Sequence, residues 1–342
     1  MDERKISAVN LKKTYISTEK TGFLKPRKKK NVEAVKGISL EIPRGKIIGL
    51  LGVNGAGKTT MIRMLSAMVE PTAGSLHIDG VDAIKHHMEV KSKLNMIAGG
   101  ERNLFWRLTA VENLSYFGRL YGLSGKPLAE RIDTLLAMVG LTEAANTPVE
   151  RYSKGMKQRL QIARGLINDP DYLFLDEPTL GLDIIIAKEI KAYISGLAAS
   201  QDKGVLLTTH YISEAEELCD YIYVIDAGTI IASGTKEDLK NLLAYKAELE
   251  VETLPLPADV KEKLEGIAAG IPNTKISFAP ASEDGKSERI SVIGDESFWP
   301  VLIDTLSAAK QPILHIRNKE PDLADVLFSI IQSSRQGAEG AL

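Results

Sequence analysis

The sequence predicts an α/β protein that carries a second, smaller α+β domain at its carboxyl end. Short apolar runs that suit buried strands alternate with amphipathic stretches that suit helices through the first two thirds of the 342 residues. A glycine-rich turn joins one such strand to one such helix. Near Ala247 the pattern changes, so we expect one domain at residues 1–244 and another at 245–334.

The composition is that of a globular protein, with 44% hydrophobic and 26% charged residues. A formal net charge of -2 argues against a protein built to bind nucleic acid. The single cysteine, Cys219, cannot form an internal disulfide, and we interpret it as a small buried side chain. We find no apolar run of membrane-spanning length and no signal peptide, which predicts a soluble, cytoplasmic protein.

The core is expected to begin with a buried strand at 46–51 (KIIGLL). The helix after the glycine-rich turn places Met61, Leu65 and Met68 on one face. The remaining core elements are predicted from similar runs: strands at 172–175 and 204–209, helices at 156–168 and 184–199, and a hairpin at 220–233. The hairpin is expected to turn at Ala227-Gly228.

The carboxyl-terminal domain is predicted to follow the order βαββαβ, with one more helix at its end. We expect strands at 247–253, 274–279, 288–293 and 312–317, and helices at 258–268, 297–309 and 321–333. This order suggests a ferredoxin-like α+β domain. Residues 335–342 are expected to form a disordered tail.

The glycine-rich turn, GVNGAGKT at 52–59, matches the pattern of a phosphate-binding loop. Its glycines let backbone N–H groups surround a phosphate chain at the positive end of the next helix. Lys58 is placed to reach the terminal phosphates, and the Thr59 hydroxyl to bind Mg²⁺. The predicted ATP-binding residues here are Gly52, Asn54, Gly55, Ala56, Gly57, Lys58, Thr59 and Thr60.

The apolar strand YLFLDEP at 172–178 ends in two carboxylates. Asp176 is placed to hold Mg²⁺ directly or through water. Glu177 is placed to polarise the attacking water as a general base. Paired acidic residues at the end of a strand are, alone, weak evidence for a catalytic or metal-binding site. The phosphate-binding loop upstream strengthens that interpretation.

Together with the motifs that follow, residues 5–240 resemble the nucleotide-binding subunit of an ABC transporter. The resemblance implies a P-loop ATPase of ABC type, with a RecA-like parallel sheet core, an antiparallel β subdomain and a helical subdomain at about 100–168. YSKGM at 152–156 resembles the signature loop. In the family this loop contacts the γ-phosphate of an ATP bound by the opposite subunit, here through the Ser153 hydroxyl and the Gly155 N–H.

Three further residues are assigned by the resemblance. GLD at 181–183 resembles the D-loop, which places Asp183 at the nucleotide. His210 resembles the switch histidine that contacts the γ-phosphate. The resemblance therefore makes His210 a catalytic residue, together with Lys58 and Glu177. Tyr15 resembles the aromatic residue that stacks on adenine.

Two departures from the family pattern are visible. The signature loop has Lys154 where the family has glycine, and Met156 where it has glutamine. Lys154 adds positive charge near the transferred phosphate, so we expect function to survive. The family's Q-loop glutamine should fall at the position of Gly100, which is followed by Glu101. No glutamine is present there. We expect Glu101 to substitute for it in metal or water contact.

Two surface segments keep alternative interpretations. Phe105 and Trp106 either lie buried under the helical subdomain or help to form the groove that receives a helix of the membrane permease. The basic run KPRKKK at 25–30 is expected in a loop between two strands. It is either a solvated loop or a contact to anionic lipid headgroups.

The resemblance implies an ATPase that uses ATP and Mg²⁺ and pairs with a second copy or a homologous subunit to drive a separate transmembrane permease. The chain would then lie peripherally on the inner face of the cell membrane. Three stretches resemble ATPases of bacterial drug-resistance-type exporters: GGERxLxWRLT, HYISEAEELCD and EPDLADVL. The alternatives are an ATP-binding regulatory subunit with little hydrolysis and a non-transport ABC ATPase.

Overall fold

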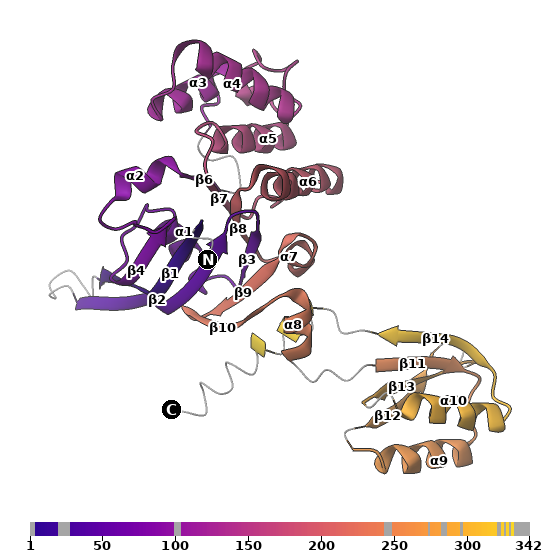
Figure 1. Ribbon diagram of the computed structural model, residues 1–342. Coiled ribbons are helices and arrows are strands. Elements are labelled where there is room, and N and C mark those ends of the chain that lie inside the picture. Colours follow the sequence, from indigo (N-terminus) through magenta and orange to yellow (C-terminus); the bar gives the residue numbers. More distant parts are fainter. Residues whose placement is uncertain are drawn as a thin grey trace. The chain divides into compact units, whose positions relative to one another are not determined.

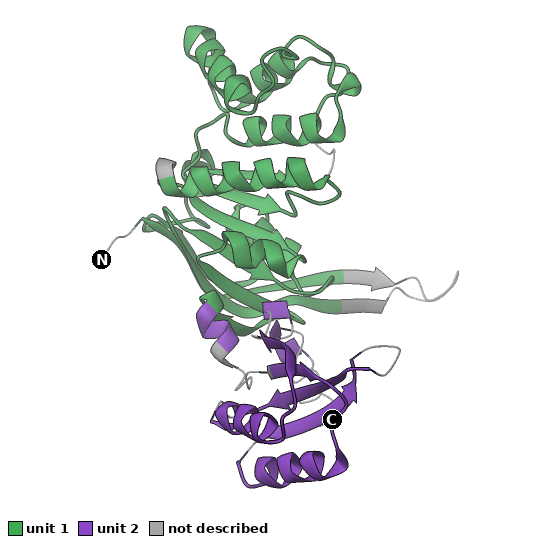
Figure 2. Cartoon of the chain, turned by 90° about the vertical axis from the view of Figure 1, so that its right-hand side faces the viewer, with its two compact units in different colours: residues 1–236 green, residues 237–342 purple. Residues whose placement is uncertain are grey.

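The computed structural model describes residues 4–19, 28–98, 104–242, 248–272, 274–281, 286–294, 297–319, 323–324, 326–327 and 330–331. The chain divides into two compact units, residues 1–236 and 237–342 (Figure 2). The boundary predicted between 244 and 245 lies outside the described residues. Each unit has its own apolar core.

A six-stranded sheet forms the centre of the first unit, in the order β10-β9-β3-β8-β7-β6 (Figure 1). Its pairs are parallel except for the hairpin β9–β10. The strands are β3 (Ile47–Leu51), β6 (Leu94–Ala98), β7 (Tyr172–Asp176), β8 (Gly204–Thr209), β9 (Tyr221–Asp226) and β10 (Thr229–Gly234). Every residue of β3 and β8 is buried, as expected for strands covered on both faces. The predicted parallel core is confirmed.

Four helices belong to this core: α1 (Lys58–Leu65), α2 (His87–Ser92), α6 (Ile184–Gln201) and α7 (Ile212–Leu218). Met61 and Leu65 of α1 are fully buried, as predicted. The prediction for Met68 is wrong, since its side chain is 60% exposed. The cause is the end of α1 at Leu65, followed by Ala67 in the left-handed conformation (φ 53°).

A second, antiparallel sheet of order β2-β1-β4-β5 shares an apolar core with the first. Its strands are β1 (Lys5–Glu19), β2 (Lys28–Pro43), β4 (Ala73–Ile78) and β5 (Val81–Asp82). The prediction of a loop at 25–30 is wrong for Lys28–Lys30, which pair with β1 as part of β2. Residues 25–27 lie outside the described part of the chain. The sheet matches the antiparallel β subdomain that the resemblance implies.

The helical subdomain contains α3 (Ala110–Leu120), α4 (Gly125–Met138), the 3₁₀ turn η1 (Val149–Arg151) and α5 (Lys154–Gly165). α3 begins at a capping box, in which Thr109 and Glu112 satisfy each other's backbone N–H groups. α5 begins two residues before the predicted 156, because Ser153 caps its first turn. It ends at Gly165, before the predicted 168. None of the helices in the described part of the chain combines the length and apolar character of a membrane span.

The boundary between the units falls at the first residue of α8 (Lys236–Leu242), and the second unit continues in the predicted order βαββαβ. Its elements are β11 (Glu248–Thr253), α9 (Ala258–Ala269), β12 (Lys275–Pro280), β13 (Glu288–Ile293), α10 (Phe298–Ala308) and β14 (Ile313–Lys319). All strand pairs are antiparallel, in the order β12-β13-β11-β14. A ferredoxin-like assignment stays a prediction. Most of the predicted helix 321–333, and the tail 335–342, lie outside the described residues.

Candidate functional site

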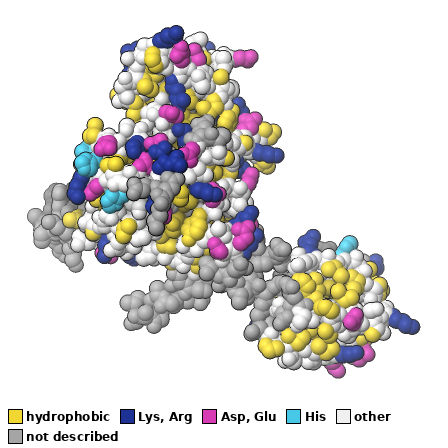
Figure 3. All heavy atoms as spheres, in the orientation of Figure 1, with side chains coloured by type: hydrophobic (Ala, Val, Ile, Leu, Met, Phe, Trp, Pro, Cys, Tyr) yellow, Lys and Arg dark blue, Asp and Glu magenta, His cyan; other side chains and the backbone are white. Residues whose placement is uncertain are grey.

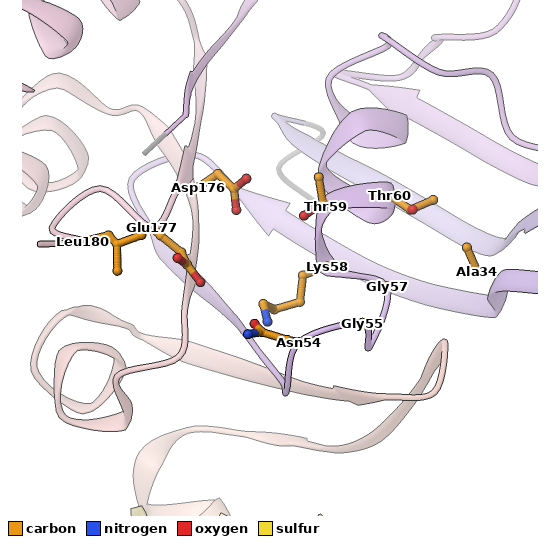
Figure 4. Close-up of a pocket in the computed structure, with 10 residues that line it drawn as sticks. All are labelled: Ala34, Asn54, Gly55, Gly57, Lys58, Thr59, Thr60, Asp176, Glu177 and Leu180. Carbon is orange, nitrogen blue, oxygen red and sulfur yellow. The ribbon is translucent and has the colours of Figure 1, made fainter. Parts of the chain in front are cut away.

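A cavity of about 380 Å³ opens where the loop after β3 faces the end of β7. Figure 4 shows the side chains of Lys58, Thr59, Asp176 and Glu177 directed at this shared space. The structure therefore brings together the two motifs that the sequence predicted to act together. The described lining consists of Ala34, Asn54, Gly55, Gly57, Lys58, Thr59, Thr60, Asp176, Glu177 and Leu180.

The loop takes a shape that its glycines permit. Gly55 and Gly57 have left-handed backbones, with φ of 83° and 109°. Gly57 also begins α1, so the backbone N–H groups at the start of that helix lie beside the cavity. A methyl group at Gly52 would collide with the backbone oxygen of Ile225. These contacts explain why the loop needs glycine at each of the three positions.

Two residues that sequence reasoning missed support the loop from behind. Gly228, in the β9–β10 turn, donates its N–H to the Ala56 carbonyl at 2.9 Å and accepts from the Lys36 N–H at 2.8 Å. A methyl group on Gly57 or Gly228 would lie 2.6 or 2.9 Å from the carbonyl oxygen of Ala34. The Ala-Gly pair correctly predicted the turn, with both residues at positive φ. No sequence signal showed that the turn touches the loop.

Lys58 is held at the mouth of the loop. Its ammonium donates to the backbone oxygens of Gly52 (2.5 Å) and Val53 (3.2 Å), and the residue is only 7% exposed. Burial lowers the pKa of Lys58, while the charges of Glu177 and Asp176 oppose that shift. The ammonium therefore lies close to both carboxylates without an ion-pair contact to either among the described contacts.

Asp176 has one oxygen fixed and the cavity on its other side. Its Oδ1 accepts from the Thr208 hydroxyl at 2.6 Å, because the β7–β8 register sets the two residues side by side. With the Thr59 hydroxyl, this carboxylate offers the hard oxygen ligands that Mg²⁺ prefers. Glu101, the third expected ligand, and Gly100 lie outside the described residues. Within the described part, no cluster of three or more His, Cys, Asp or Glu residues forms a separate metal site.

The structure pairs Glu177 with His210. The Nδ1 atom of His210 lies 2.9 Å from Oε1 of Glu177, and the centroid of the imidazole lies 4.1 Å from that of the Tyr211 ring, with the two rings tilted. Glu177 has a left-handed backbone (φ 51°), which costs a non-glycine residue about 1–2 kcal/mol. Its N–H is fixed by the Thr208 carbonyl at 3.0 Å. Such local strain beside a polar cavity is typical of a functional site.

The described cavity lining leaves out His210 and six predicted ATP-binding residues, two of which, Gly52 and Ala56, belong to the loop itself. Ser153 caps α5, its hydroxyl accepting from the Met156 N–H at 3.2 Å, and Asp183 caps α6 in the same way. Gly155 is buried against Ile186. Tyr15 is 38% exposed on β1, with the Lys13 ammonium 5.5 Å from its ring centre. Their contacts with nucleotide stay predictions.

Phe105 and Trp106 pack on the helical subdomain and yet remain 44% and 49% exposed. The Phe105 ring lies 4.8 Å from that of Tyr116, and the Lys157 ammonium lies 4.6 Å from that of Trp106. Of the two interpretations, burial under the helical subdomain does not agree with these exposed fractions. Cys219 is partly buried, and burial, with Glu214 and Asp220, raises the pKa of its thiol.

Known proteins resemble this chain over the region that carries the site. A family model described as ABC transporter matches residues 35–180. The ABC transporter ATP-binding protein NatA of Bacillus subtilis is 44% identical over 212 residues, which cover 62% of this chain and 86% of NatA. The doxorubicin resistance ATP-binding protein DrrA of Mycobacterium tuberculosis is 38% identical, covering 79% of this chain and 80% of DrrA. The Nod factor export ATP-binding protein I of Ralstonia nicotianae is 43% identical, covering 60% and 63%.

Solved structures agree with the sequences. The structure of an ATP-binding subunit of an ABC transporter has a TM-score of 0.58 and 25% identity, covering 69% of this chain and 92% of that one. The dimeric structure of an ATP-binding cassette in a post-hydrolysis state, bound to ADP and phosphate, has a TM-score of 0.58 and 26% identity, covering 67% of this chain and 98% of that one.

Proposed function

The chain belongs to the ATP-binding subunits of ABC transporters, and on that premise we propose that it powers export through a separate membrane permease. It binds and hydrolyses ATP. The observation that carries the proposal is the cavity itself, in which a phosphate-binding loop and an oxygen pair suited to Mg²⁺ meet Glu177, the carboxylate that His210 contacts. These are the parts that phosphoryl transfer to water requires.

Each residue in the cavity has a distinct task in hydrolysis. The N–H groups of the loop and the start of α1 bind the phosphate chain, and Lys58 neutralises its terminal charge. Glu177 accepts a proton from the attacking water, which lies within its reach beside the terminal phosphate. His210 holds the Glu177 carboxylate through the 2.9 Å contact and presents its other ring nitrogen to that phosphate. Mg²⁺, held by Thr59 and Asp176, would neutralise negative charge on the phosphate oxygens.

The second half of the site comes from another subunit, a second copy or a close homologue. Ser153, Gly155 and Asp183 lie outside the described lining of the chain's own cavity, which supports their use in trans. A structural neighbour is named as a dimeric cassette. ATP would be held between the loop of one subunit and the signature residues of the other, and closure and reopening would drive the permease.

The permease contact is proposed at the exposed aromatic group of Phe105, Trp106 and Tyr116, which are 44%, 49% and 45% exposed. Half-exposed aromatic side chains with fixed positions are the usual anchors of a protein interface. This contact would hold the chain at the inner face of the cell membrane. The names of relatives, including doxorubicin resistance and Nod factor export, favour export. They do not assign a cargo to this chain.

Two other functions fit less well. A regulatory subunit with little hydrolysis would not need the Glu177–His210 pair that the structure shows. A non-transport ABC ATPase that binds nucleic acid would need a basic surface. On the face drawn in Figure 3, acidic and basic side chains of the first unit lie next to one another, and the net charge of the chain is -2.

The test is the ATPase activity of the purified chain, alone and with the membrane protein that co-purifies with it. We expect the partner to raise the turnover. Trp106→Ala should lower that stimulation more than it lowers the turnover of the chain alone. An ATPase that binds no membrane protein and is unaffected by Trp106→Ala would contradict the transport role.

A further inference from the structure

Two hydrogen bonds join the segment after β7 to the segment after β8. The first is the Glu177–His210 contact at the cavity. The second joins the Thr179 hydroxyl, which donates, to Oε1 of Glu214 at 2.7 Å. Glu177 and Thr179 are two residues apart, and His210 and Glu214 are four apart across the start of α7. The two bonds therefore act between the same pair of segments, one at the cavity and one behind it.

Glu214, which accepts the second hydrogen bond, lies in surroundings that are unfavourable for a carboxyl group. It is only 4% exposed, and its other carboxylate oxygen, Oε2, is buried without a hydrogen-bond partner. No ion pair of Glu214 is found among the described contacts. A buried carboxylate with one unsatisfied oxygen costs free energy that a leucine at the same place would not. A residue that is locally unfavourable beside an active site indicates a functional use.

We propose that Glu214, acting through Thr179, is a positioning residue that fixes the Glu177–His210 pair for hydrolysis. This inference rests on the proposed function of that pair. Glu177 has a left-handed backbone and the tight turn after it is closed by the Leu180 N–H on the Glu177 carbonyl (3.2 Å). The turn leads directly to Thr179, so the hydroxyl bond to α7 fixes the direction in which the Glu177 side chain leaves the strand.

The bond also resists separation of the two segments. If residues 179–183 moved away from α7, Glu214 would lose its described hydrogen-bond partner and its buried carboxyl group would be left without one. The two hydrogen bonds thus hold His210 next to the turn that carries Leu180, a residue that lines the cavity. The phosphate-binding loop makes no contact with Thr179 or Glu214 among the described hydrogen bonds. Loss of the bond should therefore lower the rate of hydrolysis more than the affinity for ATP.

The test compares Thr179→Val and Glu214→Ala with their conservative variants Thr179→Ser and Glu214→Gln. We expect kcat to fall at least about tenfold in the first pair with KM changed less than about threefold, since small displacements of catalytic groups have such effects. The conservative pair keeps the donor and the acceptor and should stay near wild type. Glu217→Gln is the matched control, because Glu217 lies on the same helix and pairs with Lys191 at the surface.

A second measurement separates positioning from general stability. If Thr179 acts through Glu177, then Thr179→Val should have no further effect on the residual single-turnover rate of Glu177→Gln. An equal fractional loss in both backgrounds would overturn the inference, as would a kcat for Thr179→Val within twofold of wild type. Thr179→Val nearly conserves the side-chain volume, so its rate of hydrolysis can be measured even where Glu214→Ala does not fold. A wild-type chain without ATP turnover would instead overturn the proposed function together with this inference.

Discussion

At the scale of single residues, the side chains that line the site were easier to predict than the backbone contacts that support the phosphate-binding loop. Lys58, Asp176 and Glu177 were predicted from their motifs to act together, and the structure brings the three side chains around one cavity. Gly228 and Ala34 support the loop through backbone atoms. Backbone contacts between distant segments leave no residue-type signal, which is why both were missed.

Gly228→Ala should weaken both folding and ATP binding. Its φ of 84° and the 2.9 Å approach to the Ala34 oxygen leave no room for a methyl group. We expect a loss of about 1–2 kcal/mol in the free energy of unfolding, with a lower affinity for a fluorescent ATP analogue. Gly196→Ala in the middle of α6, where the added methyl meets nothing within 4 Å, should raise stability. Equal effects of the two substitutions would contradict the account.

The contacts of Asp79 should stabilise the protein at neutral pH, and this stabilisation should be lost in acid. Its carboxylate accepts from Tyr172 (2.5 Å) and pairs with Arg44 and Lys93 (2.7 and 2.9 Å). Burial acts to raise the pKa of Asp79, but these three partners hold it below its ordinary value. A depressed pKa stabilises the fold above the unfolded value of about 3.9, and that stability is lost as the pH falls through the folded value.

Urea unfolding at pH 7 and at pH 3 measures this dependence. Asp79→Asn should lower stability at pH 7 and show a smaller further loss on acidification than wild type. Parallel losses in the two proteins would show that Asp79 does not contribute to the acid dependence.

At the scale of elements, strands covered on both faces were predictable because their apolar runs are uninterrupted, as in β3 and β8. Ends of elements were predicted less well. α1 ends before Met68, because Ala67 takes the left-handed conformation although the apolar periodicity continues. α5 starts earlier than predicted, because Ser153 caps its first turn. The β1–β2 pairing reached into the predicted loop since lysine-rich segments carry little strand signal.

The register of β11 and β14 places acidic residues opposite basic ones. Glu250 lies opposite Arg317, and Glu252 lies opposite His315. Each opposite-charge pair across strands contributes about 0.2–1 kcal/mol, and like charges destabilise. Arg317→Glu should therefore lower the stability of this unit, and adding Glu250→Lys should restore it.

Fluorescence of Trp299 measures that change, because this residue of α10 packs on the core of the second unit. The other tryptophan, Trp106, is replaced by phenylalanine in the reference protein. Failure of Glu250→Lys to restore stability would show that Arg317 acts by some means other than pairing with Glu250.

At the scale of the whole molecule, one chain supplies half of each proposed ATP site. Glu177→Gln should accumulate an ATP-bound dimer, because ATP then binds without being consumed. Gel filtration with ATP and Mg²⁺ should show twice the apparent mass seen with ADP. Ser153→Glu, which sets a negative charge against the phosphate, should abolish the shift. A dimer that forms equally with ADP, or that survives Ser153→Glu, would contradict the shared site.

The most direct test of the central claim is the steady-state ATPase rate of wild type and Glu177→Gln, measured beside ATP affinity. Loss of a general base predicts a fall of about 10²–10⁴-fold in kcat. The affinity for ATP should change little, because the phosphate-binding loop and Lys58 remain in place. Glu177→Gln with the turnover of wild type would contradict the assignment of Glu177 as the base of this ATPase.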